Sequence, residues 1–169
     1  MRYAPAALAL SLLAAVTASV SFGASAALPL DARAVALVAQ GRTALGAGNT
    51  DAAIDAFEAA LAVQPGQVAI YLELAEATRR QGLQGKALHY YREALEREPN
   101  NPWAIAGEGA TLVEKGAIEK ARRNLVRLQQ ICGGDCAPSR QLAGVILKGP
   151  APRIVTAEAV QALPVVTPN

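Results

Sequence analysis

The chain has 169 residues, a formal net charge of +2 at pH 7 and 18 % charged residues. A balance so close to neutrality gives no long-range field for nucleic acid or anionic lipid. The length suffices for one domain with its own core. Because aromatic residues make up only 4 % of the chain, we expect a core built mainly of small side chains.

The N-terminal segment has the layout of a secretory signal. Met1-Arg2-Tyr3 is a short basic head, an uncharged apolar run extends from Ala4 to Phe22, and Ala24-Ser25-Ala26 supplies small residues for a signal peptidase. We expect residues 1–26 to be a signal peptide, cleaved between Ala26 and Ala27, and the mature protein to be periplasmic or secreted. The alternative is an uncleaved membrane anchor, since this run could almost span a bilayer. Its alanine, serine and threonine content favours cleavage, after which no membrane contact is expected.

Glycine and proline divide the following sequence into helical segments. Helices are expected over 32–47, 51–63, 67–81, 84–97, 102–115 and 118–131. Asp31 is placed to cap the first and Asn49 or Thr50 the second, and Pro102 suits the first turn of the fifth. A seventh apolar segment over 137–147 predicts one more helix, and residues 149–169 are expected to form a flexible tail.

The helical segments repeat with a period of 34 residues, in copies that begin at Ala34, Val68 and Pro102. The eighth and twentieth positions hold small residues, the twenty-fourth holds a large apolar one, and the thirty-second ends the second helix. In the middle copy these positions, with the twenty-seventh, hold Ala75, Ala87, Tyr91, Ala94 and Pro99; upstream they hold Gly41, Ala53, Phe57, Ala60 and Pro65; downstream they hold Gly109, Ala121, Leu125, Leu128 and Gly133. The pattern predicts two closely packed helices per copy, with the twenty-fourth side chain filling the space between them.

This 34-residue pattern of small, large apolar and helix-ending positions resembles the tetratricopeptide repeat. The resemblance covers residues 34 to 133, and the alternative is an ordinary helical bundle with coincidental spacing. It implies an all-α fold: a short right-handed α-solenoid of three helix pairs plus a C-terminal capping helix. The repeats would be 34–67, 68–101 and 102–135, the capping helix 137–147, and the whole domain 27–148.

In that family the first helix of each pair lines a concave groove that binds a peptide. Carried onto this chain, the groove positions are Val35, Val38, Arg42, Leu45, Leu72, Glu76, Arg79, Arg80, Trp103, Ala106, Val113 and Glu114. Chaperone-binding members clamp a terminal carboxylate with Lys and Asn. Here Val38, Arg42, Glu73, Trp103 and Gly107 occupy those slots, so a clamp is not expected. Trp103 either contacts the ligand or staples the start of its helix to the second repeat.

The sequence offers little for catalysis or metal binding. His89 is the single histidine, with no nucleophile or orienting carboxylate at a recognisable spacing. Cys132 and Cys136 flank a flexible Gly-Gly-Asp, and export would favour a disulfide between them. A redox pair is the sharper alternative, and two thiols alone are a poor metal site.

We therefore expect a non-catalytic protein-interaction scaffold of the periplasm or cell envelope, without a cofactor, whose groove binds a peptide or helix. Its partner would be a protein and not nucleic acid. Two other interpretations stay open at this point. One is a redox or assembly factor acting through Cys132 and Cys136, and the other is a membrane-tethered scaffold with an uncleaved N-terminus.

Overall fold

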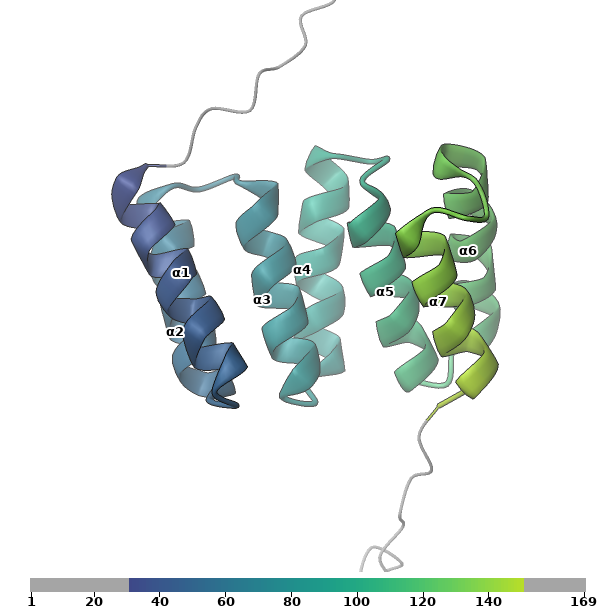
Figure 1. Ribbon diagram of the computed structural model, residues 1–169, viewed down its shortest axis with the longest axis horizontal. Coiled ribbons are helices and arrows are strands. Elements are labelled where there is room, and N and C mark those ends of the chain that lie inside the picture. The colour runs from purple at the N-terminus through teal and green to yellow at the C-terminus, as the bar shows by residue number, and fades with distance from the viewer. Residues whose placement is uncertain (1–30, 151–169) are drawn as a thin grey trace, which may run out of the picture.

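The structure, a computed structural model, describes residues 31–150, and each regular element in that range is an α-helix (Figure 1). In chain order these are α1 (Ala32–Gly46), α2 (Thr50–Val63), α3 (Val68–Arg80), α4 (Gln84–Arg97), α5 (Pro102–Glu114), α6 (Ile118–Cys132) and α7 (Ala137–Lys148). The predicted helices match these bounds to within one residue at each end. The predicted signal peptide, and the predicted tail beyond Pro150, lie outside the described residues.

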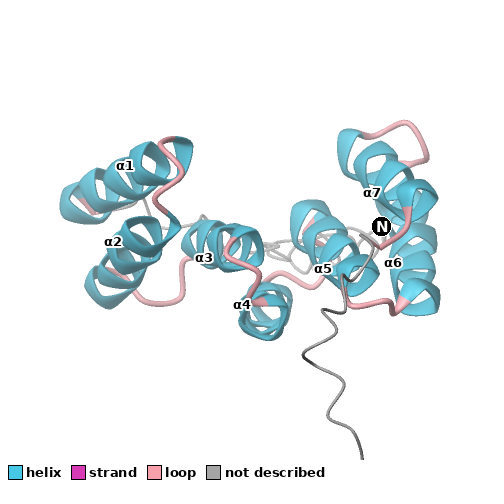
Figure 2. Ribbon diagram, turned by 90° about the horizontal axis from the view of Figure 1, so that it is seen from below, coloured by secondary structure: helices cyan, strands magenta, loops and turns pink. Residues whose placement is uncertain are grey.

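Consecutive helices form antiparallel pairs: α1 packs on α2, α3 on α4 and α5 on α6, while α7 covers both α5 and α6. Figure 2, which looks along the helices, shows α1, α3, α5 and α7 on one side of the row and α2, α4 and α6 on the other. The row bends toward the odd-numbered helices, which therefore form its concave face. The predicted all-α architecture of three helix pairs and a capping helix is confirmed. Within residues 31–150, none of the helices combines the length and apolar character that a membrane crossing needs.

The turn inside each pair depends on one glycine with a positive φ. Gly48, Gly82 and Gly116 have φ values of 79°, 82° and 80°. After each glycine, the next backbone N–H donates to a carbonyl in the last turn of the preceding helix, as Asn49 N–H does to the Ala44 carbonyl oxygen at 2.9 Å. This way of closing a helix requires a left-handed residue, a conformation that glycine adopts without steric cost. These glycines are 34 residues apart because the same turn recurs in every repeat.

Small residues let the two helices of a pair approach closely. In the first pair, a Cβ at Gly41 of α1 would lie only 2.4 Å from Cε1 of Phe57 on α2. The Phe57 ring is fully buried among Val38, Ile54 and other apolar residues. In the second pair, Ala75, Ala87 and Tyr91 form the corresponding contact. The predicted role of the small and aromatic positions holds for these two pairs.

In the third pair, part of the packing between helices comes from α7, which lies outside the pair. Leu125, expected to fill the space between α5 and α6, is only half-buried, whereas Leu128 one turn later is fully buried. A Cβ at Gly109 would lie 2.7 Å from Cδ2 of Leu142 on α7, whose side chain is also fully buried. The capping helix therefore supplies the packing that an aromatic residue supplies in the other pairs.

Gly41→Ala and Gly46→Ala make a matched pair for testing this packing, because both glycines lie on α1. A methyl group at position 41 must displace the buried Phe57 ring, so we expect the free energy of unfolding to fall by about 1–2 kcal/mol despite alanine's better helix propensity. A methyl group at position 46 meets nothing within 4 Å, so Gly46→Ala should be neutral or stabilising. Urea unfolding followed by circular dichroism measures both. Equal effects of the two substitutions would contradict this account of the α1–α2 contact.

Candidate functional site

Ion pairs connect neighbouring helices along the concave face. Arg42 of α1 pairs with Glu73 of α3 at 2.6 Å, and Arg79 of α3 pairs with Glu114 of α5 at 2.5 Å. Within α3, Glu76 pairs with Arg79 at 2.8 Å and with Arg80 at 2.7 Å. We call these six side chains the charge ladder. It contains three arginines and three carboxylates, so its net charge is zero.

Arg79 is the central member of the charge ladder. Its Nε and Nη2 donate to Glu76, and its Nη1 donates to Glu114. Burial alone would lower the pKa of Arg79, but the two carboxylates outweigh that effect and raise it above its ordinary value. Arg79 is therefore a permanent cation whose three nitrogens are already engaged.

A cavity of about 190 Å³ opens on the concave face beside Arg79. It lies between α3, α5 and α7, with one residue of α4 behind it. The cavity is lined by Leu72, Glu76, Arg79, Tyr91, Trp103, Ala106, Gly107, Ala110 and Gln141. The lining thus combines an alanine and glycine floor, two aromatic side chains and the middle of the charge ladder.

Gly107 lets Tyr91 reach this cavity from α4. A Cβ at position 107 would lie 2.2 Å from Cε1 of Tyr91, so the ring occupies the space that a side chain on α5 would take. The Tyr91 hydroxyl lies 3.5 Å from Oε2 of Glu76. Burial, and to a lesser extent the Glu76 carboxylate, raises the pKa of Tyr91 above its ordinary value. Tyr91 is thus both part of the core and part of the cavity wall.

Trp103 lies in the first turn of α5, at the cavity. The Asn101 side chain caps this turn by accepting the Trp103 and Ala104 backbone N–H groups, both at 3.0 Å. The Trp103 side chain is 52 % exposed. A staple between repeats would be buried, so the exposure favours ligand contact over the stapling role.

Comparisons with known proteins agree with this architecture. The family model of the tetratricopeptide repeat matches residues 38–102. Among solved structures, the TPR2B domain of yeast Sti1 in its Hsp70 complex superposes with a TM-score of 0.63 at 16 % identity, covering 70 % of this chain and 96 % of that one. The Yersinia enterocolitica type III secretion chaperone SycD, in complex with a peptide of the translocator YopD, gives 0.58 at 18 % identity and covers 68 % and 92 %.

A sequence relative is the cellulose synthase 2 operon protein C of Komagataeibacter xylinus, 36 % identical over 118 residues. The match spans 69 % of this chain but only 9 % of the relative's length. Together with the repeat spacing and the seven described helices, these similarities decide the family. The chain belongs to the tetratricopeptide repeat family.

The predicted groove residues of this tetratricopeptide chain separate into three groups. Leu72, Glu76, Arg79, Trp103 and Ala106 meet at the cavity, and Arg80 and Glu114 adjoin it through the charge ladder. Val35, Arg42 and Leu45 lie on α1 and do not line the cavity. Val38 and Val113 are 6 % and 1 % exposed and do not line the cavity.

Val38 and Val113 lie on the inner helices of their pairs but pack into the core between the helices. Val38 packs into the core around Phe57, and Val113 packs with Leu88 and Ala121, which turns both away from the groove. Sequence reasoning also missed Tyr91, Ala110 and Gln141 as lining residues, and it placed Gly107 in the groove only as a slot of the absent carboxylate clamp. The repeat pattern predicts a core position for Tyr91, and nothing in its local sequence indicates that it also borders a cavity.

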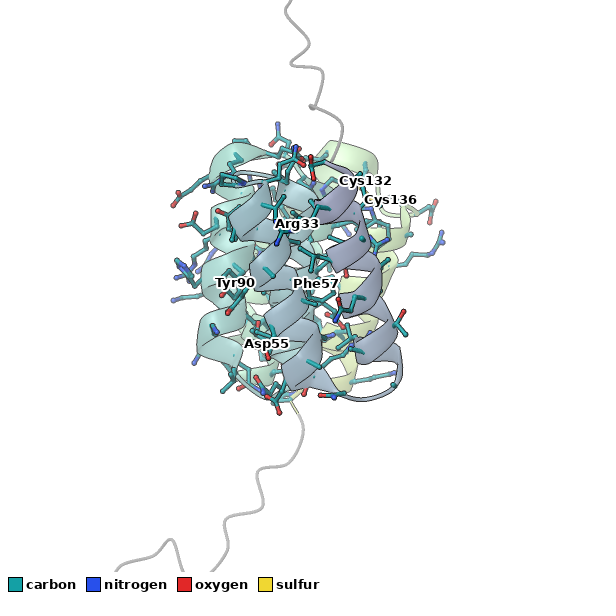
Figure 3. All side chains as sticks on the ribbon, turned by 90° about the vertical axis from the view of Figure 1, so that its left-hand side faces the viewer. Arg33, Asp55, Phe57, Tyr90, Cys132 and Cys136 are labelled. Carbon is teal, nitrogen blue, oxygen red and sulfur yellow. A yellow bond between two sulfur atoms is a disulfide. The ribbon has the colours of Figure 1, made fainter. Side chains whose placement is uncertain are left out.

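The two cysteines lie where the chain passes from α6 to α7 (Figure 3). The structure joins Cys132 and Cys136 by a disulfide with 5.9 Å between the Cα atoms. The buried Ser139 hydroxyl lies 3.3 Å from Cys136 Sγ and donates to the Gly133 carbonyl at 2.9 Å. The Ser139 hydrogen bond thus holds the same connection between α6 and α7 as the disulfide does. That the two cysteines are oxidised in the cell stays a prediction.

In the part of the chain that the structure describes, other side chains suited to chemistry are not gathered into a site. His89 is exposed on α4 beside Tyr90, at 5.5 Å between ring centroids. Within residues 31–150, no group of three or more His, Cys, Asp or Glu side chains is arranged to hold a metal ion.

The raised pKa of Tyr91 predicts a loss of stability in alkali that Tyr91→Phe should remove. The unfolded chain loses this proton near pH 10, while the folded protein retains it, so deprotonation favours the unfolded state as pH rises. Between about pH 8 and about pH 11 we expect the wild type to lose about 1 kcal/mol more than Tyr91→Phe. Urea unfolding at the two pH values measures this difference. A difference that does not change with pH would contradict the burial of this hydroxyl.

Cys132→Ser combined with Cys136→Ser should lower the free energy of unfolding by about 2 kcal/mol, because so short a loop constrains little of the unfolded chain. Partner binding should survive, since neither residue lines the cavity. Thiol titration before and after denaturation establishes the resting state, which we expect to be oxidised. Mixed disulfides trapped by either single serine variant would instead identify a redox pair.

Proposed function

We propose that this tetratricopeptide chain is a non-catalytic interaction scaffold of the periplasm or cell envelope, and that it binds a peptide segment or helix of a partner protein on its concave face. The carrying observation is Trp103, a large apolar side chain that is more than half exposed beside a cavity on that face. Exposed tryptophan next to a concavity is characteristic of residues that dominate protein binding.

The charge ladder narrows the class of partner. Each of its arginines pairs with a carboxylate of the ladder itself, at 2.8 Å or less. A terminal carboxylate would therefore have to share an arginine with a carboxylate of the ladder, whose negative charge would repel it. This supports binding through apolar contacts and backbone hydrogen bonds rather than through a carboxylate clamp.

The comparisons support the same function at a coarser level. The Sti1 and SycD structures are complexes with segments of other proteins, and both resemble this fold. The Komagataeibacter relative is named for an operon, which supports a role beside other proteins of one assembly. Because the match covers a small part of that relative, the identity of such an assembly is not carried over.

Location in the envelope rests on the sequence of residues 1–26, which has the order of basic head, apolar run and small-residue site of an exported protein. N-terminal sequencing of the protein from its native host should find Ala27 first. An N-terminus at Met1 or Arg2 would instead favour the membrane-tethered alternative.

Site-specific photo-crosslinking tests the concave face directly. A photoreactive amino acid replaces Gln141, which is exposed and lines the cavity, or Val126, which is exposed on α6 at the opposite side of the row. We expect position 141 of the full-length protein in its native host to give a discrete protein adduct and position 126 to give none. Adducts from position 126 alone, or from neither position, would contradict binding on the concave face.

A further inference from the structure

We infer that the cavity beside Trp103 is an anchor pocket for one large, uncharged, apolar side chain of the partner segment. This inference rests on the proposed function, because it names the feature by which a peptide on the concave face is recognised. It concerns the cavity between α3, α5 and α7, and not the α1 end of the groove.

The size of the cavity fits one side chain. Its volume is about 190 Å³, and an apolar cavity of about 150 Å³ is large enough to hold benzene. Ala106, Gly107 and Ala110 leave the floor free of projecting side chains, while Leu72 and the Tyr91 ring supply apolar walls. A leucine, phenylalanine or residue of similar size would fill this space.

The charges around the cavity disfavour a charged anchor. Glu76 already accepts hydrogen bonds from Arg79 and Arg80, and each nitrogen of Arg79 already donates to a carboxylate. An anionic side chain would have to share Arg79 with the carboxylates of Glu76 and Glu114 and would face the negative charge of Glu76. A cationic side chain would have to displace Arg79 to reach Glu76, so both would lose hydration without a matched partner.

Trp103 provides the side of the pocket that a ligand can cover. Its side chain is 52 % exposed, and an apolar group entering the cavity would remove part of that surface from water. A sugar ring could also stack on an exposed indole, but it needs several free hydrogen-bonding groups. Glu76 and Arg79 are engaged with one another, so the lining favours an apolar side chain over a sugar.

Trp103 is the single tryptophan of the chain, so its indole N–H signal in NMR spectra reports on this pocket alone. Each of four probes is titrated into the full-length protein: N-acetyl-leucinamide, N-acetyl-lysinamide, N-acetyl-aspartate and cellobiose. We expect the leucine probe to shift the indole signal at a concentration at least about tenfold lower than the other three. A lower concentration for either charged probe, or for cellobiose, overturns the inference.

Two alanine-to-leucine variants show whether the response comes from the cavity. Ala110→Leu places a side chain in the pocket, whereas Ala59→Leu makes the same change at an exposed position on α2. The leucine probe should lose its effect in the first variant and keep it in the second. Circular dichroism establishes that Ala110→Leu is folded; should it unfold, Gln141→Leu, at an exposed lining residue, replaces it. An unchanged response in the folded pocket variant overturns the assignment.

Selection of random peptides displayed on phage separates this inference from the proposed function. Selected peptides should share one large apolar residue, its replacement by alanine should weaken binding at least about tenfold, and Trp103→Ala should have the same effect. Raising salt from about 50 to about 500 mM should change the affinity less than about twofold. Peptides that bind through a charged residue and depend on salt would overturn the anchor pocket while retaining the scaffold. If no selected peptide binds at the concave face, the result contradicts both the anchor pocket and the proposed function.

Discussion

The close contact between the two helices of each pair is the constraint on which the rest of this structure depends. The Phe57 ring occupies the space that a side chain at position 41 would take, so α1 and α2 can pack closely only because Gly41 has no side chain. The positive-φ glycines then return the chain at the same point of every repeat. The pairs then stack side by side, and Arg42 and Arg79 each meet a carboxylate on the following odd-numbered helix.

Most of the fold could be predicted from the sequence because the decisive features are local. Side-chain caps at Asp31, Asn49 and Asn101 determine where helices begin, and glycine at Gly48, Gly82 and Gly116 determines where they turn. A cap acts within the first turn of its own helix, and glycine adopts a positive φ without steric cost, so both signals act locally. The spacing of the small and aromatic positions then predicts which helices pair.

The candidate site was predicted only in part because it depends on how repeats pack against one another. A position on the inner helix faces either the groove or the neighbouring repeat, and a small rotation decides which, as Val38 and Val113 show. Gln141 reaches the cavity because α7 lies beside α5. Tyr91 reaches it because a residue on another helix, Gly107, has no side chain. Such relations cannot be deduced from the spacing within one repeat.

The charge ladder is better explained by binding than by stability. Arg79 and Glu114 are each about one quarter exposed, and burying an ion pair costs hydration that well-packed apolar side chains would not lose. Oε2 of Glu114 is also buried without a hydrogen-bond partner, which adds a further cost. What the ladder provides is a set of charges on the concave face that are paired with one another and sum to zero. If a partner segment binds this face as we propose, it meets charges that are already paired, so its apolar contacts at Trp103 would decide the affinity.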